Sequence, residues 1–302
     1  MKFNIIGKRL RYLTISSIII LAGVISLVTL GVNEGIEFTS GSVLNISFAS
    51  AVNQADLKQE MASQGYTKAI IQQTSDTEYI IRTQALDNAS KTGLQDTLEA
   101  KFGTLSETQF YSVSPMIADE TASNAVIAVA IASLGILLYV TWAFRRMPKP
   151  FHYGTCAIVA LVHDALIALG VFSFLGGLLH WEINLMFITG ILAVIGYSVN
   201  NTVVIFDRIR ENLLAGVSRD FETVVNRSLV ETMGRSINTS LTTMVVVLAL
   251  YLFVGATIQN FAAVLIVGIV AGTFSSVFIA PSLLVIWNNK EWGRLIPFRQ
   301  TA

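Results

Sequence analysis

The stretch that decides the fold runs from Gly196 to Asn212 and reads GYSVNNTVVIFDRIREN. It ends an apolar run with two adjacent amides, Asn200 and Asn201, and passes at Asp207 into a dense cluster of charges. Polar groups at membrane depth are costly, so a chain that keeps two together is expected to use them. The stretch therefore predicts a membrane protein with a polar pathway among its helices.

The composition extends this prediction to the whole chain. Of the 302 residues, 53% are hydrophobic and 13% are charged, which is more apolar than a soluble domain of this size requires. A helix needs about 20 apolar residues to span a bilayer. Six runs approach or exceed that length: Leu13–Leu30, Ala125–Phe144, Tyr153–Gly176, Ile183–Phe206, Asn238–Val254 and Phe261–Trp287. The expected fold class is a polytopic α-helical membrane protein with six transmembrane helices.

The first run has two interpretations. Lys8, Arg9 and Arg11 precede it, as in a cleaved signal peptide. However, the run is long for a signal peptide and no pattern of small residues typical of a cleavage site follows it. A retained anchor is therefore the expected interpretation, with residues 1–31 forming the N-terminus and the first transmembrane helix.

Basic residues mark one side of the membrane. They lie before the first run, between the second and third, between the fourth and fifth, and after the sixth. Six spans place these four segments on one side, which the positive-inside rule identifies as the cytoplasm. The sequence thus predicts a multi-pass protein of a bacterial plasma membrane with both termini cytoplasmic, including a cytoplasmic loop 207–237 and a tail 288–302.

Residues 32–124 then lie outside the cytoplasm. This segment carries twelve acidic and five basic residues, which argues against a nucleic-acid or anionic-lipid surface. Its pattern predicts strands and helices in the order β-α-β-β-α-β, the order of the ferredoxin-like fold. The expected elements are Ser42–Phe48, Gln54–Ser63, Lys68–Gln73, Glu78–Thr83, Asn88–Phe102 and Gln109–Val113.

The remaining five spans form a bundle over residues 125–287, and the third span holds a carboxylate. Asp164 follows His163 in mid-span, where a carboxylate costs about 2.5–3.5 kcal/mol on insertion scales. Desolvation disfavours its charged form, which suits a proton carrier. The alternative is a neutral Asp164 that only joins neighbouring helices through a hydrogen bond.

Other polar groups have two interpretations each. Asn200 and Asn201 fit either interhelical hydrogen bonding or a polar path, and they cannot titrate. Arg235, before the hydroxyl-rich start of the fifth span, either reaches the interface or points inward at the polar groups of the third and fourth spans. In the loop, Phe221, Val224, Val225 and Leu229 share a helical stripe. This stripe fits an amphipathic helix that lies along the inner membrane surface or packs under the spans, or a solvated helical connector.

Small residues predict close helix packing. Gly268, Gly272 and Ser276 recur every four residues in the sixth span, a spacing typical of helix contacts in membranes. Gly190 and Gly196 are expected to act similarly in the fourth span.

Four motifs together resemble one family. GYSVNNTVV (196–204) followed by DRIREN (207–212) resembles the signature of the SecF family of protein-export membrane subunits. VHD (162–164) resembles its third-span motif and RSINTS (235–240) the start of its fifth span. GIEFTSG (35–41) resembles its GIDFTGG element, with Glu for Asp and Ser for Gly.

The resemblance covers nearly the whole chain, because the spacing of Tyr197, Arg208, Arg235 and Gly272 fits as well. It implies half of an RND-superfamily transporter that pairs with SecD, associates with the SecYEG channel and promotes movement of the exported polypeptide. The implied energy source is the proton gradient, or in some members sodium. No other cofactor, no metal and no nucleic acid is expected, and lipid is the only further partner.

One position departs from the family pattern. Members commonly carry a proton-relay carboxylate, paired with the later arginine, where this chain has Asn201. An amide cannot exchange a proton at any working pH. We therefore expect Asp164, Arg235 and carboxylates of the partner to carry the ion, with Asn201 and His163 as neighbours.

Other function classes have less support. The three histidines, His152, His163 and His180, have no metal-ligand spacing, and no phosphate-binding loop is present. No enzyme is therefore expected. The alternatives are an RND-type exporter half for small molecules or lipids, for which the 32–124 domain is small, and a purely structural assembly subunit.

Overall fold

The computed structural model describes residues 4–179, 181–253 and 256–294, and the chain divides into two units. Glu34–Val126 forms the small domain, and Met1–Asn33 with Ile127–Ala302 forms the helix bundle. These boundaries lie two residues beyond those expected at 31/32 and 124/125. His180, the expected end of the fifth span at Val254, and residues 295–302 of the expected tail lie outside the described residues.

The small domain has the predicted ferredoxin-like fold. Its four strands lie in the order β2-β3-β1-β4, and every neighbouring pair is antiparallel. The sequence places one helix between β1 and β2 and a second between β3 and β4. The elements are β1 (Gly41–Phe48), α3 (Gln54–Ser63), β2 (Ile70–Gln73), β3 (Glu78–Thr83), α4 (Asn88–Phe102) and β4 (Leu105–Val113).

Alternation along β1 explains the core of this domain. Leu44, Ile46 and Phe48 are buried, and they pack with Leu57 of α3 and Leu98 of α4. Successive strand residues point to opposite faces, so one face of the sheet is covered by the helices. The prediction for β4 started four residues too late, at Gln109, because Leu105–Thr108 has no alternating apolar pattern.

The chain enters β1 through a strained residue. After the short helix α2 (Ile36–Thr39), Ser40 has φ 63° and ψ 158°, a region that is nearly restricted to glycine. Gly41 follows with φ 143°, and a β-carbon there would lie 2.7 Å from the carbonyl oxygen of Thr83. The family element resembled by residues 35–41 has glycine at both positions, and this chain keeps only the second.

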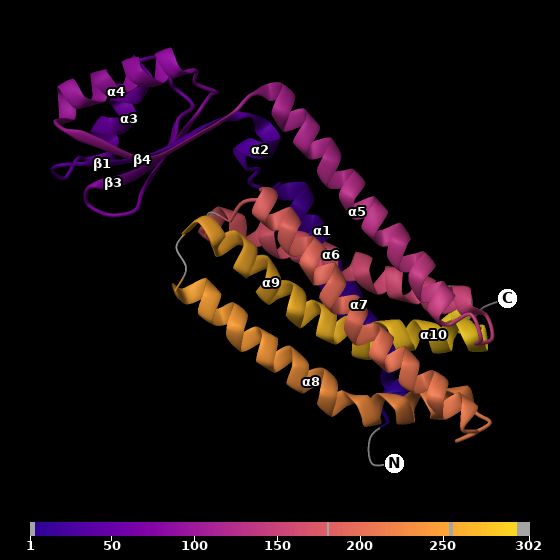
Figure 1. Ribbon diagram of the computed structural model, residues 1–302. Helices are drawn as coiled ribbons and strands as arrows, with labels where there is room; N and C mark the ends of the chain where they lie inside the picture. The colour runs from indigo at the N-terminus through magenta and orange to yellow at the C-terminus, as the bar shows by residue number, and fades with distance from the viewer. Residues whose placement is uncertain (1–3, 180, 254–255, 295–302) are drawn as a thin grey trace. The chain divides into compact units, whose positions relative to one another are not determined.

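Six helical segments of the described chain are long and apolar enough to cross a membrane, which confirms the predicted number. The sixth is formed by α9 and α10, both labelled in Figure 1, with a π-helical turn called η2 between them. The helices are α1 (Arg9–Thr29), α5 (Pro115–Ala143), α6 (Pro150–Leu179), α7 (Leu185–Leu214), α8 (Phe221–Phe253), α9 (Ala256–Phe274), η2 (Ser275–Ile279) and α10 (Ala280–Asn289).

The expected loop 207–237 is mostly helix, and the helices of the fourth and fifth spans extend into it from both sides. Helix α7 continues to Leu214 and α8 begins at Phe221, so only six residues connect them. Val224, Val225 and Leu229 are fully buried, and the last two join a core with Ile5. The apolar stripe therefore packs beneath the membrane-spanning helices, and the solvated connector is excluded.

Helix α1 docks on α6 through small residues. A β-carbon on Gly170 would lie 2.7 Å from the Cα atom of Gly23, so the two backbones touch. One turn further, Ser26 Oγ lies 2.8 Å from Ser173 Oγ, and Ser173 donates to the carbonyl oxygen of Gly31 at 2.6 Å. Small residues that let backbones approach, with hydroxyls bonding across, are typical of helix pairs in membranes.

Candidate functional site

Helices α6, α7 and α9 pack against one another, and a buried carboxylate lies among them and η2. Asp164 of α6 is 1% exposed. Its Oδ2 accepts hydrogen bonds from Ser198 Oγ of α7 at 2.6 Å and Ser275 Oγ of η2 at 2.9 Å. Its Oδ1 lies 2.9 Å from Nδ1 of His163. The carboxylate therefore joins three membrane-spanning segments through polar contacts.

Glycine brings α9 close enough to α7 for this arrangement. A β-carbon on Gly272 would lie 3.0 Å from Ser198 Cβ and 3.5 Å from Asp164 Oδ2. A β-carbon on Gly268 would lie 2.1 Å from Val194, and one on Gly190 2.0 Å from Val264. Gly196 differs from the expectation, because it is exposed and a β-carbon there meets nothing within 4 Å. It does not pack against a neighbouring helix.

A second layer of hydroxyls continues from the carboxylate. Ser276 donates to the carbonyl oxygen of Ser198 at 3.1 Å, and its Oγ lies 2.8 Å from Thr202 Oγ1. Ser275 and Ser276 open the π-helical turn, and these adjacent side chains bond to two different helices, Ser275 to Asp164 of α6 and Ser276 to α7. π-Helical turns inside α-helices occur frequently at functional sites.

The two amides of the opening motif face different ways. Asn201 is 8% exposed, and its Nδ2 has no hydrogen-bond partner among the described residues. Asn200, one residue earlier on α7, is exposed. A buried unpaired donor costs about 1–3 kcal/mol, so Asn201 is the amide that lies unsatisfied in the bundle. Nε2 of His163 is likewise buried and has no hydrogen-bond partner among the described residues.

Arg235 does not reach the carboxylate. It is exposed on α8 and lines a pocket of about 390 Å³ with Asp207, Arg208, Glu211 and Glu231 among others. Its guanidinium forms no hydrogen bond or ion pair with any residue in the described ranges, although its backbone carbonyl accepts from Thr239 Oγ1 at 2.9 Å. The inward orientation toward the third span, one of the two interpretations of the sequence, is therefore not observed.

The charged end of the opening motif joins α7 to α8. Arg208 donates to Glu231 and to Glu211, each at 2.7 Å. Glu231 also accepts from Arg227 at 2.8 Å and from Asn212 at 2.9 Å. Asp207, a further motif residue, pairs with Arg210 at 2.7 Å. These residues hold the ends of two helices together.

Tyr197 joins three helices. Its hydroxyl donates to Ser240 Oγ of α8 at 2.8 Å, and Ser240 lies 2.6 Å from Thr273 Oγ1 of α9. The hydroxyl-rich start of the fifth span thus supplies interhelical hydrogen bonds.

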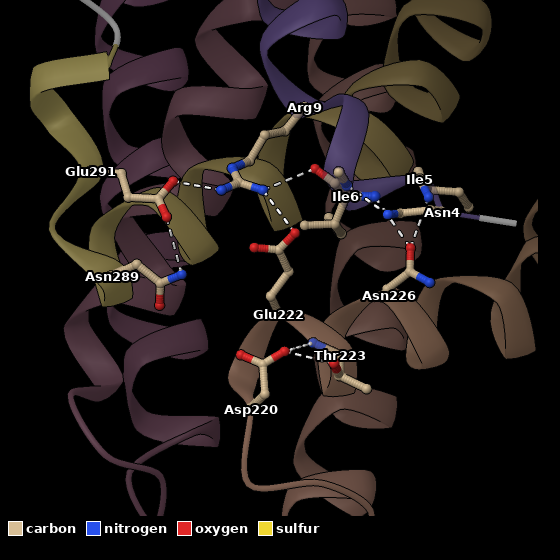
Figure 2. Close-up of polar contacts among 11 residues, drawn as sticks. Asn4, Ile5, Ile6, Arg9, Asp220, Glu222, Thr223, Asn226, Asn289 and Glu291 are labelled. Atoms are coloured by element: carbon tan, nitrogen blue, oxygen red, sulfur yellow. Dashed lines mark hydrogen bonds and ion pairs between the residues drawn. The ribbon is translucent and has the colours of Figure 1, made fainter. Parts of the chain in front are cut away.

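A charged cluster that the sequence did not predict lies at the start of α1 (Figure 2). Arg9 is 7% exposed, and its guanidinium donates to Glu222 at 2.9 Å and to Glu291 at 2.5 Å. We call these three residues the Arg9 clamp. Beside it, Asn226 Oδ1 accepts the backbone N–H groups of Ile5 and Ile6. The partners of Arg9 lie 213 and 282 residues away in sequence, so no local pattern indicated them.

The comparisons with known proteins agree with this architecture. Residues 94–290 match the family model described as protein export membrane protein SecD/SecF, C-terminal, and residues 25–52 match the SecD/SecF GG motif. The protein translocase subunit SecF of Thermobaculum terrenum is 41% identical over 99% of this chain and 97% of its own length. The SecF subunit of Anaerolinea thermophila is 40% identical over 96% of this chain and 95% of its own.

A solved structure is similar over nearly the whole chain. The crystal structure of SecDF, a translocon-associated membrane protein from Thermus thermophilus, has a TM-score of 0.83 and 30% identity. The alignment covers 96% of this chain and 39% of the SecDF chain. Six spans, the small ferredoxin-like domain and the buried polar layer therefore define a multi-pass membrane protein of the SecD/SecF type. The chain belongs to the SecF family of protein translocase subunits.

Proposed function

We propose that this SecF-family protein pairs with a SecD-type partner and uses the transmembrane ion gradient to promote polypeptide translocation by the SecYEG channel. The observation that carries the proposal is Asp164, a carboxylate 1% exposed among helices α6 and α7 and the η2 turn. Binding or release of a cation there changes the charge of a group on which three segments converge. Such a change alters their packing, which is how a gradient performs conformational work.

The similarity to SecDF supports the pairing. In that structure this chain corresponds to 39% of a single longer polypeptide, so the remaining part supplies what a separate partner subunit would supply here. Exposed apolar side chains on α5 and α8, such as Ile131, Trp142, Leu241 and Val246, leave surface for both lipid and the helices of the partner.

In this proposal, the basic segments define how the protein is oriented across the membrane. Arg208, Arg227 and the Arg9 clamp gather at one end of the bundle, and the positive-inside rule assigns that end to the cytoplasm. Both termini then face the cytoplasm, and the small domain faces the other side of a bacterial plasma membrane.

The direct experiment follows export of a pulse-labelled secreted protein in cells that lack this subunit but keep the SecD-type partner. Wild-type protein should restore the rate, and Asp164→Asn, which keeps the shape but removes the charge, should not. Asp96→Asn provides the matched control, because Asp96 is exposed on α4 of the small domain. Unchanged export in the strain without the subunit would refute the proposal. Normal export with Asp164→Asn would leave only a structural role in assembly.

A further inference from the structure

An apolar groove runs between α8 and the sixth span, which lie side by side in the bundle (Figure 1). Five of its lining residues lie on α8 between Met233 and Met244, and six lie on α9 and η2 between Ile269 and Phe278. Its volume of about 390 Å³ falls within the range of about 300–1,000 Å³ that is typical of pockets for small ligands. None of the eleven lining residues is charged, so the groove is suited to an apolar ligand.

The two hydroxyl groups in the lining are already hydrogen-bonded within the protein. Ser240 Oγ accepts from the Tyr197 hydroxyl and donates to the carbonyl oxygen of Ser236, each at 2.8 Å. Thr273 Oγ1 donates to the carbonyl oxygen of Ile269 at 2.6 Å. A polar ligand would give up its hydrogen bonds to water here without replacing them, which is unfavourable. The lining therefore favours a hydrocarbon chain.

The length of the groove matches one leaflet of a bilayer. From Met233 to Met244, α8 rises about 16 Å at 1.5 Å per residue, which is about half of a hydrocarbon core roughly 30 Å thick. An acyl chain extends through one leaflet, whereas a helix of a partner subunit crosses both. A helix of that length and about 10 Å across would also occupy roughly 1,300 Å³, which is more than the groove provides.

The π-helical turn holds the floor of the groove in place. Ser275 donates to Asp164, and Ser276 donates to the carbonyl oxygen of Ser198. Val277 and Phe278 of the same turn line the groove. The hydrogen bonds of the two serines thus fix the turn before a ligand arrives, and a preformed site binds at a lower entropic cost.

An exposed cation lies near one end of the groove. The ring of Phe278 packs against Tyr12 of α1, with centroids 4.6 Å apart. Lys8 lies one turn before Tyr12, and residues four apart share a helix face. Lys8 is exposed and its ammonium forms no ion pair within the described ranges, whereas Glu222 and Glu291 at the same end are paired with Arg9. Tyrosine and lysine are typical of the membrane–water interface, where lysine attracts anionic lipid.

We propose that this groove binds one acyl chain of an anionic phospholipid, with the headgroup at Lys8. Ile237, Leu241 and Val270 of the lining are 51%, 61% and 60% exposed, so the groove is open to lipid along its side. The chain enters from the leaflet at the basic end of the bundle and packs on Phe278. Lipid binding here does not depend on gradient coupling, so it stands or falls separately from the proposed function.

The experiment uses the purified full-length protein in detergent micelles with phosphatidylglycerol that carries a photoreactive diazirine in one acyl chain. After irradiation and digestion, mass spectrometry locates the label. We expect the label on residues 233–244 and 269–278, severalfold above its level at Ile131 and Leu134. These side chains of α5 are exposed and report ordinary contact with lipid. Unlabelled phosphatidylglycerol should displace the label from the groove more effectively than phosphatidylcholine does.

Two pairs of variants test the chain site and the headgroup site. Leu241→Trp fills the groove and should reduce labelling there about fivefold or more. Val246→Trp, at a position of α8 that is 68% exposed and outside the groove, should label as wild type does. Lys8→Gln should reduce the advantage of phosphatidylglycerol over phosphatidylcholine about fivefold, the contribution of one cation at an anionic lipid surface. Arg146→Gln, at an exposed position between α5 and α6, should leave that advantage unchanged.

Several results would overturn the proposal. Equal labelling of the groove and of α5 would show ordinary lipid contact only. Labelling of the groove that persists in Leu241→Trp would place the chain elsewhere. Equal displacement by the two unlabelled lipids would remove the headgroup site. If a co-purified SecD-type partner abolishes labelling of the groove but not of α5, a helix of the partner covers the groove and the lipid site fails.

Discussion

Two buried ionisable side chains of the helix bundle differ in the partners that surround them. Arg9 meets two carboxylates, Glu222 and Glu291, at the basic end of the bundle. Asp164 meets two hydroxyls and one imidazole among α6, α7 and η2. A buried charge with full opposite charge around it is held in place, and breaking it is strongly destabilising. A carboxylate without a fixed cation retains the capacity to take up and release one.

The largest expected effect on stability comes from breaking the Arg9 clamp. Arg9→Ala leaves Glu222 and Glu291 without their shared cation. We expect a loss of about 2–3 kcal/mol, below the value for a fully buried pair because Glu222 is 31% exposed. Thermal unfolding of the full-length protein measures it. Arg11→Ala, at an exposed position on the same helix, should change the free energy of unfolding little. An equal loss in both variants would show that the Arg9 clamp contributes no more to stability than an exposed arginine does.

Asp164→Asn tests the other half of the comparison. Asparagine is isosteric with aspartate, and its side-chain oxygen can still accept hydrogen bonds from the serine hydroxyls. The free energy of unfolding should therefore stay within about 1 kcal/mol of the wild-type value. Export should nevertheless fail. The contrast breaks down if Asp164→Asn unfolds as readily as Arg9→Ala, because Asp164 would then be a structural group as well.

The stability of the first turn of α8, beside the Arg9 clamp, should decrease at low pH. The Thr223 hydroxyl and backbone N–H both donate to Asp220 and lower the pKa of its carboxyl below the usual value. An ionised Asp220 therefore stabilises this turn above about pH 4, the unfolded value, and the contribution is lost as pH falls through the lower folded pKa. Its magnitude should be below about 1 kcal/mol.

Hydrogen exchange of residues 221–226 at decreasing pH, corrected for the intrinsic exchange rate, measures this loss of protection. In Asp220→Asn, whose amide also caps helices, protection should not vary with pH. A wild-type protein whose protection is equally insensitive to pH would contradict the assigned role of Asp220.

The smallest expected effect on stability and export comes from a change at Asn201. Asn201→Asp places a second carboxylate in α7 and removes the unpaired Nδ2 donor. We expect stability to change by less than about 1 kcal/mol and export to be kept or to depend more strongly on the proton gradient. Export rates at two external pH values provide the measurement. A failure equal to that of Asp164→Asn would contradict the expected tolerance.

The sequence predicted those parts of the fold that local patterns encode. Strand alternation and helix spacing gave α3, β3 and α4 of the small domain at their observed bounds. Hydropathy gave six spans, but it ended the fourth at Phe206, because charges at 207–211 look like a membrane boundary. In the structure these charges pair with one another and with α8, so helix α7 continues through them.

The site was only partly predictable. The cost of a mid-membrane carboxylate pointed to Asp164, and the spacing of small residues pointed to Gly268 and Gly272. Its hydroxyl partners were not predicted, since serine is common in such helices and nothing local reveals a π-helical turn at Ser275. Arg9 served only as a marker of topology, because an ion pair across 282 residues is a property of tertiary structure.

The contact between α1 and α6 constrains the order in which the helices can pack during synthesis. Gly23 and Ser26 find their partners only when the ribosome has made Gly170 and Ser173, 147 residues after Ser26. At 5–20 residues per second, that interval is roughly 7–30 s. During it the Ser26 hydroxyl can bond only within its own helix, as serine does to the carbonyl oxygen one turn back. The first helix to enter the membrane is thus among those whose packing is completed late.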